Sequence, residues 1–169
     1  MTWYLLLIGA VAVERLAEVV VAERNRSMSR ERGGVEFGAG HYPVMVALHT
    51  GLLAGCLLEP VALHRPFIPA LGWSMLAIAL AAQALRWWCI TTLSYQWNTR
   101  VIVIPGAARI SGGPYRFVPH PNYVAVIVEG FALPLVHTAW ITALVFSVLN
   151  AALLRTRIHV ENAALASLA

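Results

Sequence analysis

The sequence predicts an all-α, polytopic integral membrane protein with about five transmembrane helices. Of its 169 residues, 59% are hydrophobic and 12% are charged, and the mean hydropathy is +0.70. Soluble domains contain about 45–50% apolar and about 25% charged residues. The apolar residues also form long runs, and about 20 such residues cross a hydrocarbon core roughly 30 Å thick. A soluble globular domain is therefore excluded.

Five apolar runs, separated by polar segments, define the expected helices. They cover residues 3–21, 43–58, 68–90, 123–136 and 139–154. The last two runs are short, and only His137 and Thr138 separate them, which indicates a tight helical hairpin. Such a hairpin crosses a thinned region of the bilayer or packs as a partly re-entrant pair.

Two polar segments accompany the expected helices. Residues 91–122 connect the third helix to the fourth, and residues 155–169 form a tail after the fifth. With these short connections the chain has no room for a second, soluble domain. We therefore expect one membrane-embedded domain spanning residues 1–169.

The arginines predict the orientation in the membrane. The chain has no Lys and no Asp, so its net charge of +4 arises from twelve Arg and eight Glu. The loop after the second helix carries only Arg65, whereas four arginines follow the first helix: Arg24, Arg26, Arg30 and Arg32. Because Arg-rich loops stay in the cytoplasm, we expect the N-terminus outside and the C-terminus inside. Nucleic-acid binding is not expected, because basic clusters interleaved with exposed aromatic residues are missing.

Ionisable residues inside membrane helices are costly and indicate candidate functional positions. Glu14 and Glu18 share a face of the first helix, and Arg15 can neutralise Glu18. This group is either a structural ion cluster or part of a substrate site. On the second helix, His41 and His49 can share a face, as hydrogen-bonded core residues or as ligands. The sequence has no metal-ligand spacing, so no metal site is expected.

The 91–122 segment is long, and its aromatic and β-branched residues favour folding onto the membrane domain over disorder. Gly112 and Gly113 allow the backbone to approach a ligand closely. Pro121 can begin the fourth helix, which places His120 and Asn122 beside the positive end of the helix dipole. These features predict a site for a polar or anionic ligand head.

The hairpin predicts that the 155–169 tail meets this site. Because its two helices run in opposite directions, both outer ends return to the same membrane face. His120 and Tyr123 should therefore lie near Arg157 and Glu161. The sequence thus predicts a polar ligand site at the cytoplasmic face, made by two distant segments.

The motifs in these segments resemble a known family. "GGPYRFVPHPNY" at residues 112–123, a short hairpin and "RTRIHVENAAL" from Arg155 are similar to the C-terminal half of the isoprenylcysteine carboxyl methyltransferase family. The family's usual pattern is G-P-Y-R, R-H-P-x-Y, a hairpin and R-x-x-x-E-E, and the match covers about residues 105–165. The resemblance implies a membrane enzyme that binds S-adenosylmethionine without a Rossmann fold, releases S-adenosylhomocysteine and takes a lipidic acceptor from the bilayer.

The resemblance also assigns roles to individual residues. Those matching the cofactor pocket are Tyr115, His120, Pro121, Tyr123, Arg157 and Glu161. Three positions depart from the family's pattern. Pro119 replaces the usual Arg, Asn162 replaces the second Glu, and Ala107 lies where many members carry His. The lost Arg and Glu indicate either a compensating charge change or a pocket for a different acceptor.

Three further stretches are similar to a bacterial branch of this family that O-methylates alkylresorcinols or alkylpyrones. They are "EFGAGHYPVMVALH", "WNTRVIVIPGA" and "RIHVENAAL". This resemblance implies a phenolic or pyrone lipid as acceptor and a bacterial inner membrane as location. A protein-S-isoprenylcysteine carboxyl O-methyltransferase is the alternative.

A phenolic acceptor also requires a general base. A resorcinol hydroxyl has a pKa of about 10, whereas a carboxylate or an acidic enol is already ionised at neutral pH. Glu129 is the first candidate and His41 the second. The alternative for Glu129 is a buried carboxylate paired with Arg86 or Arg15.

Two other classes of function remain open from composition alone. In a small proton-coupled exporter, Glu14 would alternate between a proton and a lipophilic cation. Such a transporter needs internal symmetry or a dimer, and it does not need a structured 91–122 segment. A purely structural membrane subunit is the second possibility.

Overall fold

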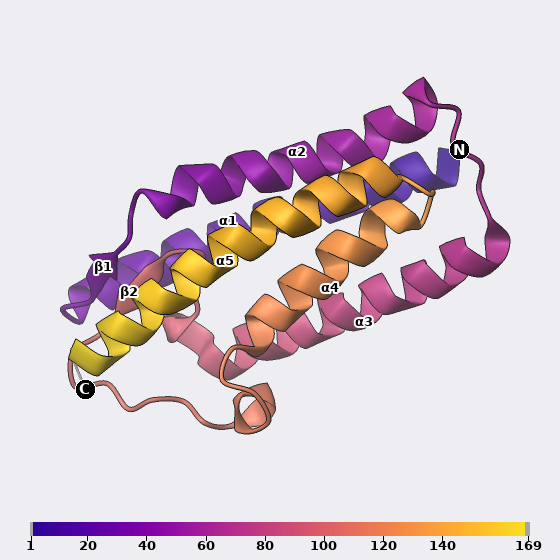
Figure 1. Ribbon diagram of the computed structural model, residues 1–169. Coiled ribbons are helices and arrows are strands. Elements are labelled where there is room, and N and C mark those ends of the chain that lie inside the picture. Colours follow the sequence, from indigo (N-terminus) through magenta and orange to yellow (C-terminus); the bar gives the residue numbers. More distant parts are fainter. Residues whose placement is uncertain (1, 168–169) are drawn as a thin grey trace.

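Five antiparallel helices form an elongated bundle in the computed structural model, which describes residues 2–167 (Figure 1). They are α1 (Thr2–Glu31), α2 (His41–Ala62), α3 (Pro69–Leu93), α4 (Pro121–Leu135) and α5 (Trp140–Ser167). The N- and C-termini lie at opposite ends of the bundle. Three of the helices, α2, α3 and α5, are long and apolar enough to cross a membrane. The expected all-α membrane architecture is confirmed.

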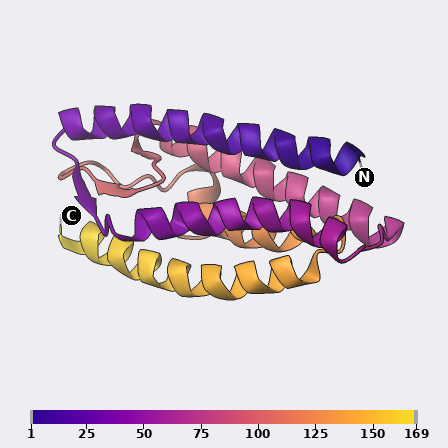
Figure 2. The same cartoon turned by 90° about the horizontal axis from the view of Figure 1, so that it is seen from above.

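Small elements gather at the end of the bundle that carries the C-terminus (Figures 1 and 2). Strands β1 (Val35–Phe37) and β2 (Val101–Val103) pair antiparallel, with Glu36 opposite Ile102. Two 3-10 turns, η1 (Ser94–Gln96) and η2 (Gly113–Arg116), lie in the connection from α3 to α4. The β-branched run of β2 favours an extended strand. Sequence analysis did not predict the pairing, because β1 lies far away in the chain.

Two helices continue well beyond their expected ends. The first reaches Glu31, where Val21 was expected, and the last reaches Ser167, where Leu154 was expected. Hydropathy marks where a helix leaves the apolar layer, but the backbone continues as long as no residue breaks it. No Gly or Pro interrupts either extension, and α1 ends only before Gly33, which has a φ of +79°. Most of the expected tail is thus helical, and residues 168–169 of it lie outside the described residues.

Helix α4 is short and lies between α3 and α5 (Figure 1). Its 15 residues span about 22 Å, which is less than a hydrocarbon core. Gly130 allows the close approach to α5, since a Cβ atom there would overlap the ring of Phe146. One face of the short helix thus packs against its longer neighbours, while Val124, Ile127 and Phe131 remain exposed.

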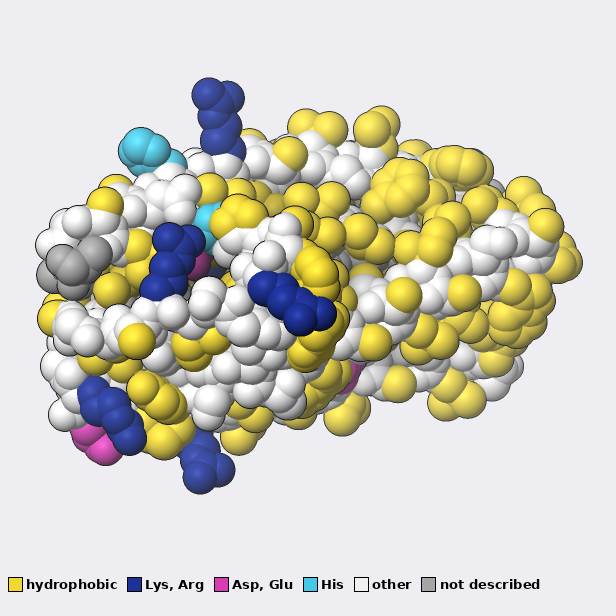
Figure 3. All heavy atoms as spheres, turned by 90° about the horizontal axis from the view of Figure 1, so that it is seen from below, with side chains coloured by type: hydrophobic (Ala, Val, Ile, Leu, Met, Phe, Trp, Pro, Cys, Tyr) yellow, Lys and Arg dark blue, Asp and Glu magenta, His cyan; other side chains and the backbone are white. Residues whose placement is uncertain are grey.

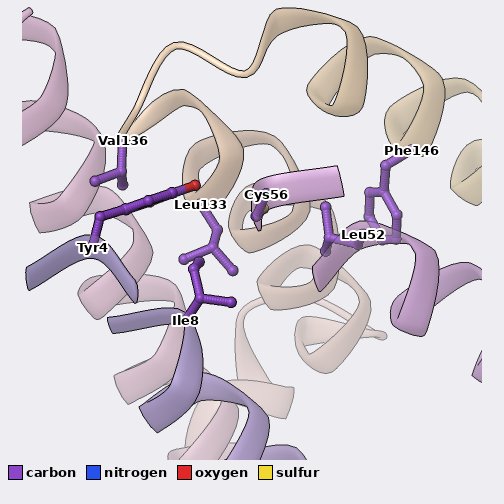
Figure 4. Packing of buried hydrophobic residues seen from close by; sticks show 7 residues of the cluster. All are labelled: Tyr4, Ile8, Leu52, Cys56, Leu133, Val136 and Phe146. Carbon is purple, nitrogen blue, oxygen red and sulfur yellow. The ribbon is translucent and has the colours of Figure 1, made fainter. Parts of the chain in front are cut away.

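A cluster of buried side chains joins four helices toward the N-terminal end of the bundle (Figure 4). It consists of Tyr4 and Ile8 from α1, Leu52 and Cys56 from α2, Leu133 and Val136 at the end of α4, and Phe146 from α5. In lipid, such a cluster stabilises the bundle through close packing more than through escape from water.

Glu59 of α2 holds the start of α5. Its carboxylate accepts hydrogen bonds from the backbone N–H groups of Ile141 (3.1 Å) and Thr142 (2.7 Å), and from the Thr142 hydroxyl (2.8 Å). Arg65 neutralises the same carboxylate at 3.1 Å. These contacts satisfy N–H groups that have no partner within α5, and a negative charge there complements the helix dipole. The α4–α5 hairpin is thus fastened to α2.

The surface divides into an apolar and a charged part. On the face shown in Figure 3, hydrophobic side chains cover most of the bundle, whereas Arg and His side chains gather toward the end that carries the C-terminus. Along α1, the exposed hydrophobic residues include Leu6, Val13, Leu16 and Val20. An apolar surface of this extent suits lipid contact.

Candidate functional site

A cavity of about 920 Å³ extends into the bundle from the end that carries the β1–β2 ribbon. All five helices and the connection from α3 to α4 contribute to its wall. One part of the wall is apolar and the other carries charged and hydroxyl groups. The cavity can therefore hold a ligand that has both polar and apolar parts.

The 112–123 turn and the C-terminal part of α5 meet at this cavity. The Tyr123 hydroxyl donates a 2.6 Å hydrogen bond to Glu161, and His120 Nε2 lies 3.1 Å from the Asn162 amide oxygen. His120 Nδ1 lies 3.6 Å from the Glu161 carboxylate, and the rings of His120 and Tyr123 stack at 5.4 Å. The two segments that sequence analysis expected to converge are in direct contact.

Arg157 contributes a buried positive charge to the cavity wall. Its side chain is 5% exposed and donates a 2.8 Å hydrogen bond to the Thr99 carbonyl. Its guanidinium also lies 3.2 Å from the Met45 sulfur and 6.0 Å from the centroid of the Tyr123 ring. Its Nε atom is buried without a hydrogen-bond partner in residues 2–167. One cationic donor thus remains unused beside the cavity.

Two further residues that the resemblance assigned to the cofactor pocket are Tyr115, which lies on the cavity wall, and Pro121, which does not. Tyr115, on η2, lines the cavity. Burial, and then the neighbouring Cys89 thiol, raise the pKa of Tyr115 above its ordinary value, so its hydroxyl stays protonated. Pro121 is fully buried as the first residue of α4 and does not line the cavity. Of the six assigned residues, the structure brings five to the cavity wall.

Neither expected base lies on the wall of the large cavity. Glu129 is 7% exposed and forms ion pairs with Arg86 and, at 3.5 Å, with Arg15. It therefore has the partners that the alternative interpretation named. His41 begins α2, beside Gly38, and its Nδ1 atom is buried without a hydrogen-bond partner within the described chain.

The ion cluster expected on α1 extends to two further helices. Arg15 pairs with Glu18 at 3.0 Å and with Glu14 at 3.3 Å, and Arg86 of α3 lies 3.6 Å from Glu18. Gln83 and Trp87 of α3 also donate to Glu14. This network joins α1, α3 and α4 at the inner end of the cavity, which Arg15, Glu18 and Arg86 line.

Sequence analysis missed an ion pair that holds the α3–α4 connection, which forms part of the cavity wall. Glu36 of β1 accepts hydrogen bonds from Arg100 (2.6 Å) and Arg30 (3.3 Å), and the Arg100 guanidinium lies 3.8 Å above the Tyr42 ring. Burial alone would raise the pKa of Glu36, but the Arg100 hydrogen bond and the charges of Arg100, Arg26 and Arg30 lower it below its usual value. The α3–α4 connection is thus fixed to α1 and α2.

Sequence analysis did not place two polar residues, His49 and Asn150, at the cavity. His49 was recognised only as one of two histidines on α2, and Asn150 lies within the apolar run of α5. A single amide inside an apolar helix was the signal available for Asn150. Its side chain is 2% exposed.

Comparison with known proteins identifies the family. The sequence model of the isoprenylcysteine carboxyl methyltransferase (ICMT) family matches residues 75–167, which include α4, α5 and the Tyr123–Glu161 contact. The chain belongs to the ICMT family. It is also 36% identical over 161 residues to the Bacillus subtilis (strain 168) protein named "Uncharacterized protein YpbQ", and the match covers 95% of each chain. No solved structure matches it.

The three departures from the ICMT pattern all lie at the cavity. Ala107, Pro119 and Asn162 line its wall. Asn162, which stands where the family usually has a second Glu, faces His120 through its amide oxygen. A neutral acceptor thus stands beside His120, and with Pro119 the polar end of the cavity has one acidic and one basic side chain fewer than the pattern that the resemblance implies.

Proposed function

We propose that this protein is an integral membrane, S-adenosylmethionine-dependent O-methyltransferase whose acceptor is a phenolic or pyrone lipid. The observation that carries the proposal is the contact between Tyr123 and Glu161, which closes the polar end of a cavity of about 920 Å³. The family membership supports methyl transfer, and the apolar helices support a site within the membrane.

Unpartnered polar atoms at the cavity fit the amino-acid end of the methyl donor. Arg157 Nε is a buried donor and Asn122 Oδ1 a buried acceptor, and neither has a hydrogen-bond partner in residues 2–167. The first suits a carboxylate, and the second suits an ammonium group. Glu161 adds a carboxylate for a cationic ligand, while Tyr115 and Tyr123 supply hydroxyl groups. When bound here, the methyl donor supplies an electrophilic methyl group on a sulfonium.

The apolar wall of the cavity suits the lipid chain of the acceptor. Leu16 and Val19 of α1 and Val46 of α2 line the cavity and are also exposed on the outer surface, Leu16 by 67%. The cavity wall is therefore continuous with the surface that faces lipid. An acceptor can enter between α1 and α2 while its polar head moves toward Tyr123.

The surrounding residues do two things for methyl transfer. They hold the acceptor oxygen in line with the bond from sulfur to the methyl group, and they exclude water from that bond. The oxygen–methyl bond forms as the sulfur–methyl bond breaks, and its electron pair stays on sulfur. A phenolic acceptor must also lose its proton, so it needs a base at the cavity.

The distribution of arginine supports an orientation in the bacterial inner membrane. Arginines gather at the end with the C-terminus, in the last turns of α1, in the α3–α4 connection and on α5, whereas the connection from α2 to α3 carries only Arg65. The positive-inside rule places the cavity and the C-terminus in the cytoplasm and the N-terminus outside. The cavity then faces the compartment that supplies the methyl donor.

Two alternatives are weighed by the same residues. A prenylated cysteine carboxylate fits the family, but the neutral Asn162 and Pro119 alter the polar end of the pocket. A proton-coupled exporter would need a free carboxylate at Glu14, and that carboxylate is held by Arg15, Gln83 and Trp87. The lipid methyltransferase accounts for more of the structure.

Calorimetry with S-adenosylhomocysteine, using purified protein in detergent, tests the cofactor proposal. Saturable binding is expected, and its absence would contradict the enzyme and leave the transporter or subunit reading. Mass spectrometry after incubation with an alkylresorcinol, an alkylpyrone or a farnesylated cysteine then tests the acceptor. We expect a gain of one methylene mass on a phenolic or pyrone lipid, whereas a gain on the cysteine alone would establish the alternative.

A further inference from the structure

A phenolic acceptor needs a base on the cavity wall, and His49 lies there. We propose that His49 of α2 is this base, and this inference rests on the proposed function. His49 lines the large cavity and also the small pocket of about 20 Å³ beside it. It is half-buried, and Met45, one turn earlier on α2, lies 3.2 Å from Arg157 of the proposed cofactor site.

A backbone contact fixes the tautomer of His49. Its Nδ1 atom lies 2.9 Å from the carbonyl oxygen of Met45, one turn earlier on α2. A carbonyl oxygen only accepts hydrogen bonds, so Nδ1 carries the proton. The neutral ring then has its lone pair on Nε2, and no hydrogen bond from residues 2–167 occupies that atom. The ring is thus held as a proton acceptor directed away from its own helix.

Two residues of α5 define the surroundings of the ring. The rings of Phe146 and His49 pack in a T-shaped arrangement, with 5.4 Å between centroids and 86° between planes. Asn150, one turn further along α5, lines the same cavity, and its Oδ1 atom is buried without a partner among the described residues. Phe146 lies on the small pocket, whereas the large cavity offers the free base of His49 and the free amide oxygen of Asn150. This set fits an aromatic ring with two hydroxyl groups, one facing His49 and the other Asn150.

The other charged groups near His49 are already paired with one another. Arg15 of α1, Arg86 of α3 and Glu129 of α4 line the small pocket with it, and Glu18 lies on the large cavity. Glu129 and Glu18 each contact both arginines. Phe146 and Asn150, the neighbours from α5, carry no charge. Both carboxylates are thus paired with arginines, whereas no hydrogen bond within the described residues engages His49 Nε2.

His49 Nε2 takes the proton from the phenolic O–H as the oxygen–methyl bond forms and the sulfur–methyl bond breaks. Sulfur loses its positive charge by keeping the electron pair, and the imidazolium gains one positive charge. The proton then passes to water at the open end of the cavity. An acceptor that is already ionised needs no such transfer, which makes the inference testable.

The test compares His49→Gln with the wild type on two acceptors. An alkylresorcinol has neutral hydroxyl groups at pH 7, whereas a hydroxylated alkylpyrone is an acidic enol and already ionised. We expect kcat to fall at least about 100-fold on the resorcinol and less than about fivefold on the pyrone. S-adenosylhomocysteine affinity should be unchanged. His64→Gln, an exposed change in the α2–α3 connection, is the matched control and should behave as the wild type.

The other possible outcomes contradict either the role of His49 or the proposed acceptor class. Equal losses on both acceptors, or full activity of His49→Gln on the resorcinol, would overturn the role of His49 alone. A wild type that binds S-adenosylhomocysteine but methylates neither acceptor would overturn the acceptor class, and this inference with it. If His49→Gln does not fold, His49→Ala is tested with added imidazole. Recovery on the resorcinol but not on the pyrone is then expected, and no recovery would overturn the role.

Discussion

Tyr123, at the start of α4, and Glu161, near the end of α5, are joined by a 2.6 Å hydrogen bond across the α4–α5 hairpin. This contact joins the two segments of the proposed cofactor site. Tyr123→Phe removes the hydroxyl and keeps the ring. Since a hydrogen bond to a charged group contributes about 1.5 kcal/mol, affinity for S-adenosylhomocysteine should fall about tenfold. Isothermal calorimetry measures this change.

Tyr95→Phe provides the control for that experiment. Tyr95 lies on η1, outside the cavity wall, and its ring packs under Arg32. The affinity of Tyr95→Phe for S-adenosylhomocysteine should equal that of the wild type. Equal affinity of Tyr123→Phe and the wild type would show that the Tyr123–Glu161 contact does not shape the site.

Glu129 is expected to stabilise the bundle through its ion pairs. Glu129→Gln leaves Arg86 and Arg15 with less negative charge nearby, and breaking a buried pair from one side costs about 3 kcal/mol. Thermal unfolding in detergent should therefore show a lower Tm. The double variant Glu129→Gln with Arg86→Gln should lower the Tm by less than the sum of the decreases that the two single changes cause. Glu23→Gln, an exposed change on α1, serves as control.

A different result would favour Glu129 as the general base. A base at that position predicts that Glu129→Gln keeps its Tm and its S-adenosylhomocysteine affinity but loses methylation of a phenolic lipid. This pattern would contradict the structural role and the assignment of His49 together.

Glu59 should contribute to stability as the acceptor at the start of α5. Glu59→Ala removes three hydrogen bonds and the pair with Arg65, and we expect a loss of about 2 kcal/mol. Chemical unfolding in mixed micelles measures this loss. Glu31→Gln, at the exposed end of α1, is the comparison, and an equal effect of the two variants would refute the capping role.

Glu36 should make the stability of the α3–α4 connection at the cavity sensitive to acid. Its pKa in the folded protein is lowered, so its contribution to stability is complete above the pKa of the unfolded chain. That contribution is lost as the pH falls through the lowered folded value. Glu36→Gln should be less stable than the wild type at pH 7 by about 1 kcal/mol. The two Tm values should converge in acid, and a constant difference at every pH would contradict the ion pair.

The sequence predicted the class of fold and the meeting of two distant segments, for reasons that are physical. Long apolar runs must be helical in lipid, and a two-residue connection such as His137-Thr138 forces a hairpin. That hairpin brought Tyr123 to Glu161. The motif resemblance then named residues that the structure places on one cavity wall.

Other features depended on contacts that no local pattern encodes. The β1–β2 pairing and the Glu36–Arg100 contact join residues far apart in the chain. The ends of α1 and α5 were missed because hydropathy changes where lipid ends, whereas a helix continues until its backbone is broken. His49 and Asn150 acquire a common role only when α2 and α5 are packed together.

Photolabelling most directly tests the claim that the methyl donor binds between the 112–123 turn and the end of α5. Purified protein is irradiated with radiolabelled S-adenosylmethionine and digested, and the labelled peptides are identified. We expect label in peptides that contain Tyr115 to Tyr123 or Arg157 to Asn162, and unlabelled S-adenosylhomocysteine should remove it. Label confined to other helices, or label that the competitor does not displace, would contradict the account.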